Sequence, residues 1–537
     1  MKEGNVNKVC RVIALIAATA MLFSGCGNKK TDTVVSQGTV TYPANGTYPV
    51  SSEDELSLWI PLTAVVSAQV SNFGDTPLAK EMEKVIGAKV TYIHPATGME
   101  KEQFNLLLAS DGMPDIISYD WYKYGGDKAI DEGYIQPLNE VIDKWAPNLK
   151  KVLSDMPEID GMLRTDSGRY YAFPFIRENL DLCVYGGPII RADWLKKLNM
   201  DVPETIDEWD TMLTAFKEKL GATAPLSIGG KVPFNNGMII GAYGITTGFY
   251  VDGNQVKYGP VQPEYKEFLL KMREWYQKGL LDSNFSGTDS KILESNMLNN
   301  KSGVTYGLTG SNLGAWLMAK KSTNDTEFNL VGAPYPTLNK GDKPQFGQMD
   351  WQYSTASSWA ITKSCKNVEL AARYLDYGYS EEGYNLYNYG PEGVTWEMKD
   401  GVPTFTDFVW HNPDGDSATA VINRYSMGNY GGPCVQSWHL KQSIQSFPQQ
   451  NEAVEAWKKT DMSKHAMPLV TLTAEEAEEK SSIFADLDTY MWEMLYSFIM
   501  GTADLSEYDN YVSRMKQLGV DRVVELQQQA LDRYNAR

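Results

Sequence analysis

The chain has 537 residues, of which 42% are hydrophobic and 12% aromatic. This much apolar material can bury a large core, and a chain of this length is expected to fold as more than one domain. The formal net charge at pH 7 is -19, and Lys and Arg do not gather in runs. Because binding to nucleic-acid phosphates requires clustered cations, the composition argues against a nucleic-acid partner.

The N-terminus carries an apolar stretch at residues 12–23, which follows basic residues and precedes the small pair Ser24 and Gly25. As a helix this stretch would span roughly 18 Å, which is less than the ~30 Å hydrocarbon core of a bilayer. A charged segment, an apolar segment and small residues in this order are typical of a secretory signal. We therefore expect residues 1–25 to be a signal peptide.

The sequence LFSGC (22–26) at the end of this signal resembles the lipobox of bacterial lipoproteins, whose cysteine becomes the lipid-modified first residue after cleavage. The resemblance implies that Cys26 is the lipidation site. It also implies that the chain is secreted and held at the outer face of the bacterial cell membrane by this lipid anchor only. Residues 26–52 are rich in Gly, Ser, Thr, Asn and Pro and predict a flexible tether.

Strand and helix patterns alternate after the tether. Leu56–Pro61 and Ala88–Ile93 predict strands on either side of a helix at Pro77–Ile86, and Asp115–Ser118 predicts the next strand. This alternation is typical of βαβ units and a parallel sheet. Ligands of such sheets bind beyond the carboxyl ends of the strands, so the residues that follow the last of these strands are candidates for a site.

Helical spacing of apolar residues becomes more frequent toward the C-terminus. Thr205 and Glu208 have the spacing of a capping box at the start of one such helix. The C-terminal third is therefore expected to be mostly helical. The helices expected in this half of the chain are Arg191–Asn199, Thr205–Leu220, Val368–Tyr377, Ala474–Met500 and Leu505–Tyr534.

Three cysteines follow Cys26, at Cys183, Cys365 and Cys434. No two of them stand in C-x-x-C spacing, which argues against a zinc ribbon and a thioredoxin-like motif. The spacing does not decide whether any two of the three form a disulfide.

Motifs of familiar enzymes are missing from the sequence, which contains no H-E-x-x-H, G-x-S-x-G or P-loop pattern. Asn412, Asp414 and Asp416 have the spacing of the first EF-hand ligands, but the glycine and glutamate positions of such a loop hold other residues. We therefore expect no catalytic residue, no cofactor and no metal ion. A surface glycoside hydrolase stays open as an alternative, because the two carboxylates of such enzymes have no fixed spacing in the sequence.

Six segments spread over most of the chain carry a family resemblance in their sequence and their order. They are GMPDIISYDWYKYGG (112–126), GRYYAFPF (168–175), IIRADWLKKLNMDVPETIDEW (189–209), NNKSGVTYGLTGSNLGAW (299–316), VGAPYPTLNKG (331–341) and ARYLDYGYSEEGYNLYNYGPEGVTW (372–396). Together they resemble the extracellular solute-binding proteins of ABC importers, specifically the carbohydrate-binding group that includes maltose-binding protein. The last segment is similar to the long lipoprotein branch of this family.

The resemblance implies an α/β fold of the two-lobed, type II periplasmic-binding-protein kind. Each lobe would be a mostly parallel sheet flanked by helices, with a helix-rich C-terminal third. The chain would pass between the lobes more than once, so that each lobe is built from two separate stretches. The implied division is 53–170 with 304–355 for the first lobe, 171–303 with 356–537 for the second, and hinges near 168–175, 302–308 and 350–360.

The resemblance also implies a sugar site between the lobes. A sugar presents flat C–H faces that stack on aromatic rings, and hydroxyl groups that bind planar donors and acceptors. Arg177 and Glu178 follow the first crossing, and either face this cleft or form a surface salt bridge. The positions that match the family's ligand contacts are Tyr119, Asp120, Trp121, Ser311, Asn312, Trp316, Asp350, Trp351 and Trp438.

These resemblances predict a monomeric binding protein without chemistry of its own. It would capture an oligosaccharide between its lobes and deliver it to the permease subunits of an ABC transporter, whose ATPase is a separate chain. Two alternatives stay open at this point. One is a binder of peptides or other solutes on the same fold, and the other is the glycoside hydrolase named above.

Overall fold

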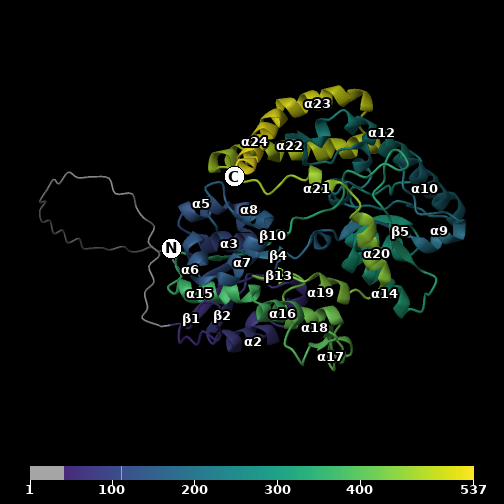
Figure 1. Ribbon diagram of the computed structural model, residues 1–537. Coiled ribbons are helices and arrows are strands. Elements are labelled where there is room, and N and C mark those ends of the chain that lie inside the picture. The colour runs from purple at the N-terminus through teal and green to yellow at the C-terminus, as the bar shows by residue number, and fades with distance from the viewer. Residues whose placement is uncertain (1–41, 111) are drawn as a thin grey trace, which may run out of the picture.

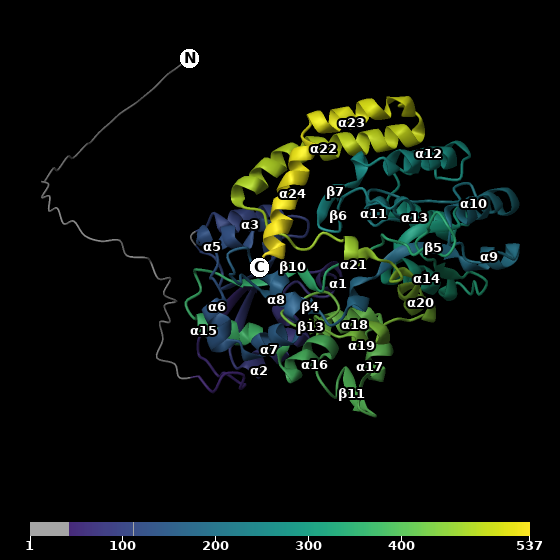
Figure 2. The ribbon, with the colours of Figure 1, turned by 45° about the horizontal axis from the view of Figure 1, so that its top comes forward.

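The computed structural model describes residues 42–110 and 112–537, so the expected signal peptide (1–25) and the lipidation site Cys26 lie outside the described residues. The described chain forms two lobes, each with its own sheet and surrounding helices (Figures 1 and 2). Each lobe also has its own large cluster of buried apolar side chains. The expected two-lobed α/β fold is therefore confirmed.

The first lobe is built on a six-stranded sheet in the order β13-β4-β10-β3-β1-β2. β1 pairs in parallel with β2 and β3, as the βαβ pattern of the sequence predicts, whereas β10 is antiparallel to both of its neighbours. The strands are β1 (Glu55–Trp59), β2 (Lys89–Ile93), β3 (Ile116–Tyr119), β4 (Phe173–Arg177), β10 (Tyr353–Ile361) and β13 (Val435–Gln436).

The first helix of the βαβ unit shows why these elements form where the sequence places them. The Thr76 hydroxyl caps α2 by accepting a hydrogen bond from the amide of Ala79, and Gly87 ends the helix in the left-handed conformation. The other helices of this lobe are α1 (Ala64–Ser67), α3 (Glu100–Leu108), α4 (Trp121–Tyr124), α5 (Gly126–Asp131), α6 (Asn139–Trp145), α7 (Pro147–Asp155), α8 (Pro157–Leu163), α15 (Val368–Asp376), α16 (Glu381–Tyr389), α17 (Asp407–Trp410), α18 (Ala418–Tyr425) and α19 (Trp438–Ser443). α2 spans Pro77–Ile86, as expected, and a hairpin of β11 (Trp396–Lys399) and β12 (Val402–Phe405) completes the lobe.

The expected tether, residues 26–52, is wrong for its last part. Residues 42–52 pack against the first lobe, where Val50 is buried and the Tyr48 hydroxyl donates a hydrogen bond to the carbonyl of Arg373 at 3.0 Å. Composition suggested a solvated segment, but its two tyrosines and Val50 supply enough apolar surface to attach it to α15.

The second lobe contains a three-stranded sheet in the order β8-β5-β9, with hairpin β6-β7 beside it. Its three strands are antiparallel, which differs from the mostly parallel sheet expected here. The strands are β5 (Gly186–Arg191), β8 (Val304–Leu308), β9 (Leu330–Gly332), β6 (Phe249–Asp252) and β7 (Gln255–Tyr258). The helices are α9 (Ala192–Leu198), α10 (Ile206–Leu220), α11 (Val232–Asn235), α12 (Glu264–Gln277), α13 (Ser290–Leu298), α14 (Ala315–Ser322), α20 (Pro448–Trp457) and α21 (Met462–His465).

The division of the chain between the lobes also differs from the expectation. β8 lies in the expected first-lobe stretch 304–355, but it pairs with β5 in the second lobe. Most of β10 and the chain from there to α19 lie in the expected second-lobe stretch 356–537, yet they belong to the first sheet and its core. The local strand pattern was correct. Which sheet a strand joins depends on long-range pairing that the pattern does not encode.

A helical arm ends the chain and reaches across both lobes (Figures 1 and 2). It consists of α22 (Ala474–Met500), α23 (Tyr508–Gln517) and α24 (Val520–Asn535). α22 has the expected bounds, and its packing against α12 attaches the arm to the second lobe. The expected helix Leu505–Tyr534 is divided, because Gly519 adopts a φ of 99° between α23 and α24.

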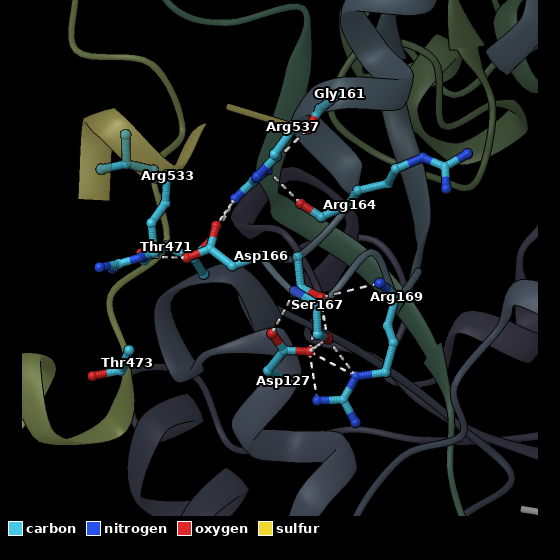
Figure 3. A network of polar contacts seen from close by, with 12 residues as sticks. Asp127, Gly161, Arg164, Asp166, Ser167, Arg169, Thr471, Thr473, Arg533 and Arg537 are labelled. Atoms are coloured by element: carbon cyan, nitrogen blue, oxygen red, sulfur yellow. Dashed lines mark hydrogen bonds and ion pairs between the residues drawn. The ribbon is translucent and has the colours of Figure 1, made fainter. Parts of the chain in front are cut away.

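The tip of the arm binds the first lobe at the carboxylate of Asp166, in the turn before β4, and at two nearby backbone carbonyls (Figure 3). Arg533 donates to Asp166 at 2.9 Å, and Arg537 pairs with the same carboxylate. Arg537 also donates to the carbonyls of Gly161 and Arg164, at 3.1 and 2.7 Å. The arm therefore forms a second connection between the lobes, separate from the crossings of the chain.

Replacing Asp166 with Ala removes the shared partner of two partly buried guanidinium groups, so we expect the free energy of unfolding to fall by about 1 kcal/mol. Glu479→Ala is the matched control, because the Arg522–Glu479 pair joins α24 to α22 within the arm and is more exposed. We expect a clearly smaller effect, because water and salt screen an exposed pair. Urea unfolding measures both, and equal effects would contradict a special role for the connection to the first lobe.

Candidate ligand-binding site

Three segments of the described chain carry it between the lobes. They lie between β4 and β5 (178–185), between β9 and β10 (333–352), and between α19 and α20 (444–447). None of these coincides with the expected hinges near 168–175 and 302–308, which lie inside or beside strands of the two sheets. The expected hinge near 350–360 overlaps only the end of the second crossing.

The first two crossings are bonded to each other. The guanidinium of Arg177 donates to the carboxylate of Asp350 at 3.0 Å and to the carbonyl of Trp351 at 2.5 Å. The Tyr185 hydroxyl donates to the same Asp350 carboxylate at 2.8 Å. Asp350 was expected to contact ligand, but its carboxylate binds Arg177 and Tyr185 and so holds these two crossings together. For Arg177, a salt bridge was one of the two expected roles, and this is the salt bridge that it forms.

Two pockets share Tyr430 in their lining, and one of them is also lined by residues of the first and third crossings. The lobe-1 pocket has a volume of about 610 Å³ and opens at the carboxyl end of β3. The interlobe pocket has a volume of about 160 Å³ and is lined by residues of both lobes, including Arg177 of the first and Thr309 of the second. A hollow of about 800 Å³ also exists, but it is lined by residues around α9 and α14 on the second lobe.

Tyr119 and Asp120 both line the lobe-1 pocket, as the family resemblance implies. The ring of Tyr119 is stacked on that of Phe104, with centroids 3.7 Å apart. Asp120 caps α4 by accepting a hydrogen bond from the amide of Lys123 at 3.0 Å, and burial raises its pKa. A half-buried carboxylate and a tyrosine edge at a strand end are suitable sugar contacts, so their role in binding stays a prediction.

Trp121 and Trp316 are core residues, which contradicts their expected role in stacking. Trp121 is fully buried, and its indole donates to the carbonyl of Ile117 at 3.0 Å. Trp316 is 1% exposed and packs in the cluster between α14 and α20. Each tryptophan follows polar residues in the sequence, which suggested an exposed ring. In the structure α4 and α14 begin at this point, and both helices direct the indole into the core.

The remaining expected contacts are divided. Trp438 begins α19 and lines the interlobe pocket, with its backbone amide bonded to the Glu178 carboxylate at 2.7 Å. Trp351 is half-buried against the first core and donates from its indole to the carbonyl of Met467 at 3.1 Å. These contacts leave only part of the Trp351 ring available to a ligand.

Ser311 and Asn312 lie in the short π-helical turn that follows β8, and neither lines the two pockets. The side chain of Asn312 accepts a hydrogen bond from the amide of Leu308 at 2.8 Å and so caps the end of the strand. Thr309, two residues earlier than Ser311, is the residue of this turn that reaches the interlobe pocket.

Several pocket residues come from the stretch 427–445, which the sequence analysis left without a role except for Trp438. Tyr430 stands in a turn made by Gly432, whose φ of 108° excludes most other residues. Gln436 and Lys441 follow in β13 and α19. An aromatic residue in the glycine-rich run GNYGG was the one available sequence signal.

The EF-hand-like carboxylates and the three cysteines have other partners or stay unpaired in the described chain. Arg424 lies between the EF-hand-like carboxylates, at 3.7 Å from Asp414 and 3.5 Å from Asp416. The described residues contain no cluster of three or more His, Cys, Asp or Glu side chains arranged to hold a metal. Cys183, Cys365 and Cys434 are buried free thiols, which answers the question of their pairing.

Comparison with known proteins agrees with this architecture. Residues 74–385 match the bacterial extracellular solute-binding protein family, and the chain belongs to this family. It is 24% identical to the fructooligosaccharide ABC transporter substrate-binding protein FusA of Streptococcus pneumoniae serotype 4, with 97% of each chain covered. It is also 24% identical to lipoprotein LipO of Bacillus subtilis strain 168, over 94% of this chain and 95% of LipO.

Among solved structures, the crystal structure of the alginate-binding protein AlgQ2 without calcium ion is similar in fold, with a TM-score of 0.70 and 25% sequence identity. The match covers 91% of this chain and all of that one (100%). The two-lobed arrangement is thus that of a solute-binding protein.

The positions of Trp121 and Trp438 predict losses of stability of different size. Trp121→Ala should lower the free energy of unfolding by about 3 to 5 kcal/mol, because it leaves a large cavity beside β3. Trp438→Ala should lower it by about 1 kcal/mol or less, because that ring lies at the pocket surface. Chemical unfolding followed by tryptophan-independent far-UV circular dichroism measures both, and a mild effect at Trp121 would contradict its place in the core.

Proposed function

We propose that this protein is a lipid-anchored solute-binding protein that captures an oligosaccharide between its lobes and delivers it to the permease of an ABC transporter. Family membership supports the binding role, and FusA and AlgQ2 are named for carbohydrates. The observation that carries the proposal is the interlobe pocket, where an aromatic ring and polar side chains of both lobes surround one cavity.

The polar groups of this pocket suit sugar hydroxyls. Gln436 is 6% exposed, and its side-chain amide has no hydrogen-bond partner among the described residues, although it lines the pocket. Its amide atoms are not among the fully buried ones, so they are accessible from the pocket, where a ligand hydroxyl can form hydrogen bonds with them. Trp438 in the same pocket offers a flat surface for the apolar face of a sugar ring.

Binding would favour the closed arrangement of the lobes. A ligand that touches both walls of the interlobe pocket gains contacts when the walls approach, so it binds the closed state more tightly and shifts the population toward it. The crossings between the sheets supply the hinge for this movement. No chemical step is needed, and we propose that the protein is not an enzyme.

The anchor and partners follow from the N-terminal sequence and from the relatives. We propose cleavage before Cys26, lipidation of this residue and location at the outer face of the cell membrane, with residues 27–41 as the tether. LipO, a relative over most of its length, is named a lipoprotein. Within the described residues no helix is long and apolar enough to cross a membrane. The protein would act as a monomer.

A thermal-shift screen of residues 27–537 tests the binding role directly, because a ligand that binds only the folded state raises the melting temperature. We expect a rise with one class of oligosaccharide and none with mixed peptides, amino acids or metal ions. A rise in melting temperature with peptides alone would favour a peptide-binding protein of the same fold. Release of reducing ends during overnight incubation would favour the glycoside hydrolase.

Trp438→Ala tests whether the interlobe pocket is the site. We expect the substitution to lower the affinity for the oligosaccharide found in the screen at least fivefold. This corresponds to about 1 kcal/mol of binding free energy for the loss of a stacking ring. Trp410→Ala is the matched control, since that ring is 41% exposed on the first lobe and lines neither pocket. Isothermal titration calorimetry measures both, and equal affinities of the two variants would place the site elsewhere.

Cys26→Ala tests the anchor. We expect the variant to lose labelling by a radioactive lipid precursor and to leave the membrane fraction of cells that express the full chain. Ser24→Thr, which keeps the cysteine, serves as a control for expression and export. Unchanged labelling of the alanine variant would contradict lipidation at this residue.

A further inference from the structure

One lysine of the interlobe pocket has no counter-charge. Lys441 lines the pocket from α19, and no acidic side chain of the described residues forms an ion pair with it. Its pKa is lowered, first by burial and then by the nearby positive charge of Arg177. A half-buried cation beside a second cation is unfavourable unless something compensates it.

Asp181 is the acidic residue that lines the pocket, and both it and the neighbouring Asp350 are already engaged. Asp350 binds Arg177 and the Tyr185 hydroxyl, as described above, and Asp181 binds Lys458 at 3.1 Å. The pocket therefore contains paired charges and the one unpaired cation of Lys441. The lobe-1 pocket is lined by two more lysines, Lys101 and Lys123, but these are exposed.

Another half-buried lysine shows that this situation is not a general feature of the protein. Burial also lowers the pKa of Lys480 on α22, and it too lacks an acidic partner among the described residues. Its ammonium, however, lies over the rings of Phe249 and Phe484, 5.5 and 5.9 Å from their centroids. Cation–π contacts compensate Lys480, whereas no such ring contact is found for Lys441 in the part of the chain that the structure describes.

The neighbours of Lys441 match one kind of ligand. Trp438 and Lys441 are three residues apart on α19, so they lie on one side of the helix, and both line the pocket. A sugar ring stacked on Trp438 would therefore have its substituents on the same side of α19 as Lys441. The unpaired amide of Gln436 is a second donor on the same pocket wall.

We infer that Trp438, Lys441 and Gln436 form a subsite for a carboxylated sugar ring, so that the captured oligosaccharide is an acidic one of the uronide class. The ring stacks on Trp438, the carboxylate pairs with Lys441, and Gln436 donates a further hydrogen bond to it. This inference rests on the proposed function and adds the chemical class of its ligand.

A matched pair of ligands tests the subsite. We would titrate residues 27–537 with tetragalacturonate and tetramannuronate, and with the methyl ester of each, which keeps the rings and removes the charge. We expect at least one acid to bind at least tenfold more tightly than its ester. Equal binding of acid and ester, or binding of neutral fructooligosaccharides alone, would overturn the uronide subsite and leave the proposed function intact. If neither uronides nor neutral oligosaccharides bind, both are overturned.

Variants of Lys441 complete the test. Lys441→Gln should reduce the affinity for the acid at least tenfold and leave that for the ester unchanged, whereas Lys441→Arg should keep most of the affinity for the acid. Lys480→Gln, the matched control, should change neither. Melting temperatures of all variants show that they are folded, and an unchanged affinity of a folded Lys441→Gln for the acid would contradict the role of this lysine.

Discussion

The bonded pair of crossing segments is the constraint on which the rest of the structure depends. Arg177 at the end of β4 binds Asp350 of the second crossing, and the Gln348 side chain accepts hydrogen bonds from the amides of Tyr185 and Gly186. Neither segment can move away alone without leaving charged and backbone groups unpaired in a partly buried place. In the closure that we propose, the lobes would rotate about this pair without separating, as in hinge closure.

The same constraint decides where a ligand can be held. Because Arg177 and Tyr185 line the interlobe pocket, the hinge forms one of its walls, and the pocket changes shape whenever the lobes rotate. The arm that binds Asp166 adds a second connection at a distance from the crossings along the chain (Figure 3). A body held at two places rotates most easily about the line through them. The arm would therefore restrict the directions in which the two lobes can close.

The sequence predicted local structure well because local structure depends on neighbouring residues. The bounds of α2 and α22, and the capping box of Thr205 and Glu208 at α10, follow from caps, helical spacing and glycine stops. The assignment of strands to lobes failed at β8, because a short apolar strand fits either sheet and only its long-range partner decides between them. Among site residues, the sequence identified Tyr119, Asp120 and Trp438 as neighbours of the pockets. The sequence could not distinguish Trp121 from these pocket residues. Successive side chains at the start of a helix point in different directions, so Asp120 faces the pocket whereas the next residue, Trp121, faces the core.

An acidic ligand is compatible with an acidic protein because the two effects act over different distances. The chain carries a formal charge of -19, which repels an anionic oligosaccharide at long range. At physiological ionic strength this repulsion is screened over about 8 Å, so it has little influence once the ligand reaches the pocket. The contact between a carboxylate and the half-buried ammonium of Lys441 is screened much less, since water has limited access there. For the proposed subsite, the local charge of the pocket would therefore influence which sugars are retained more than the net charge of the protein.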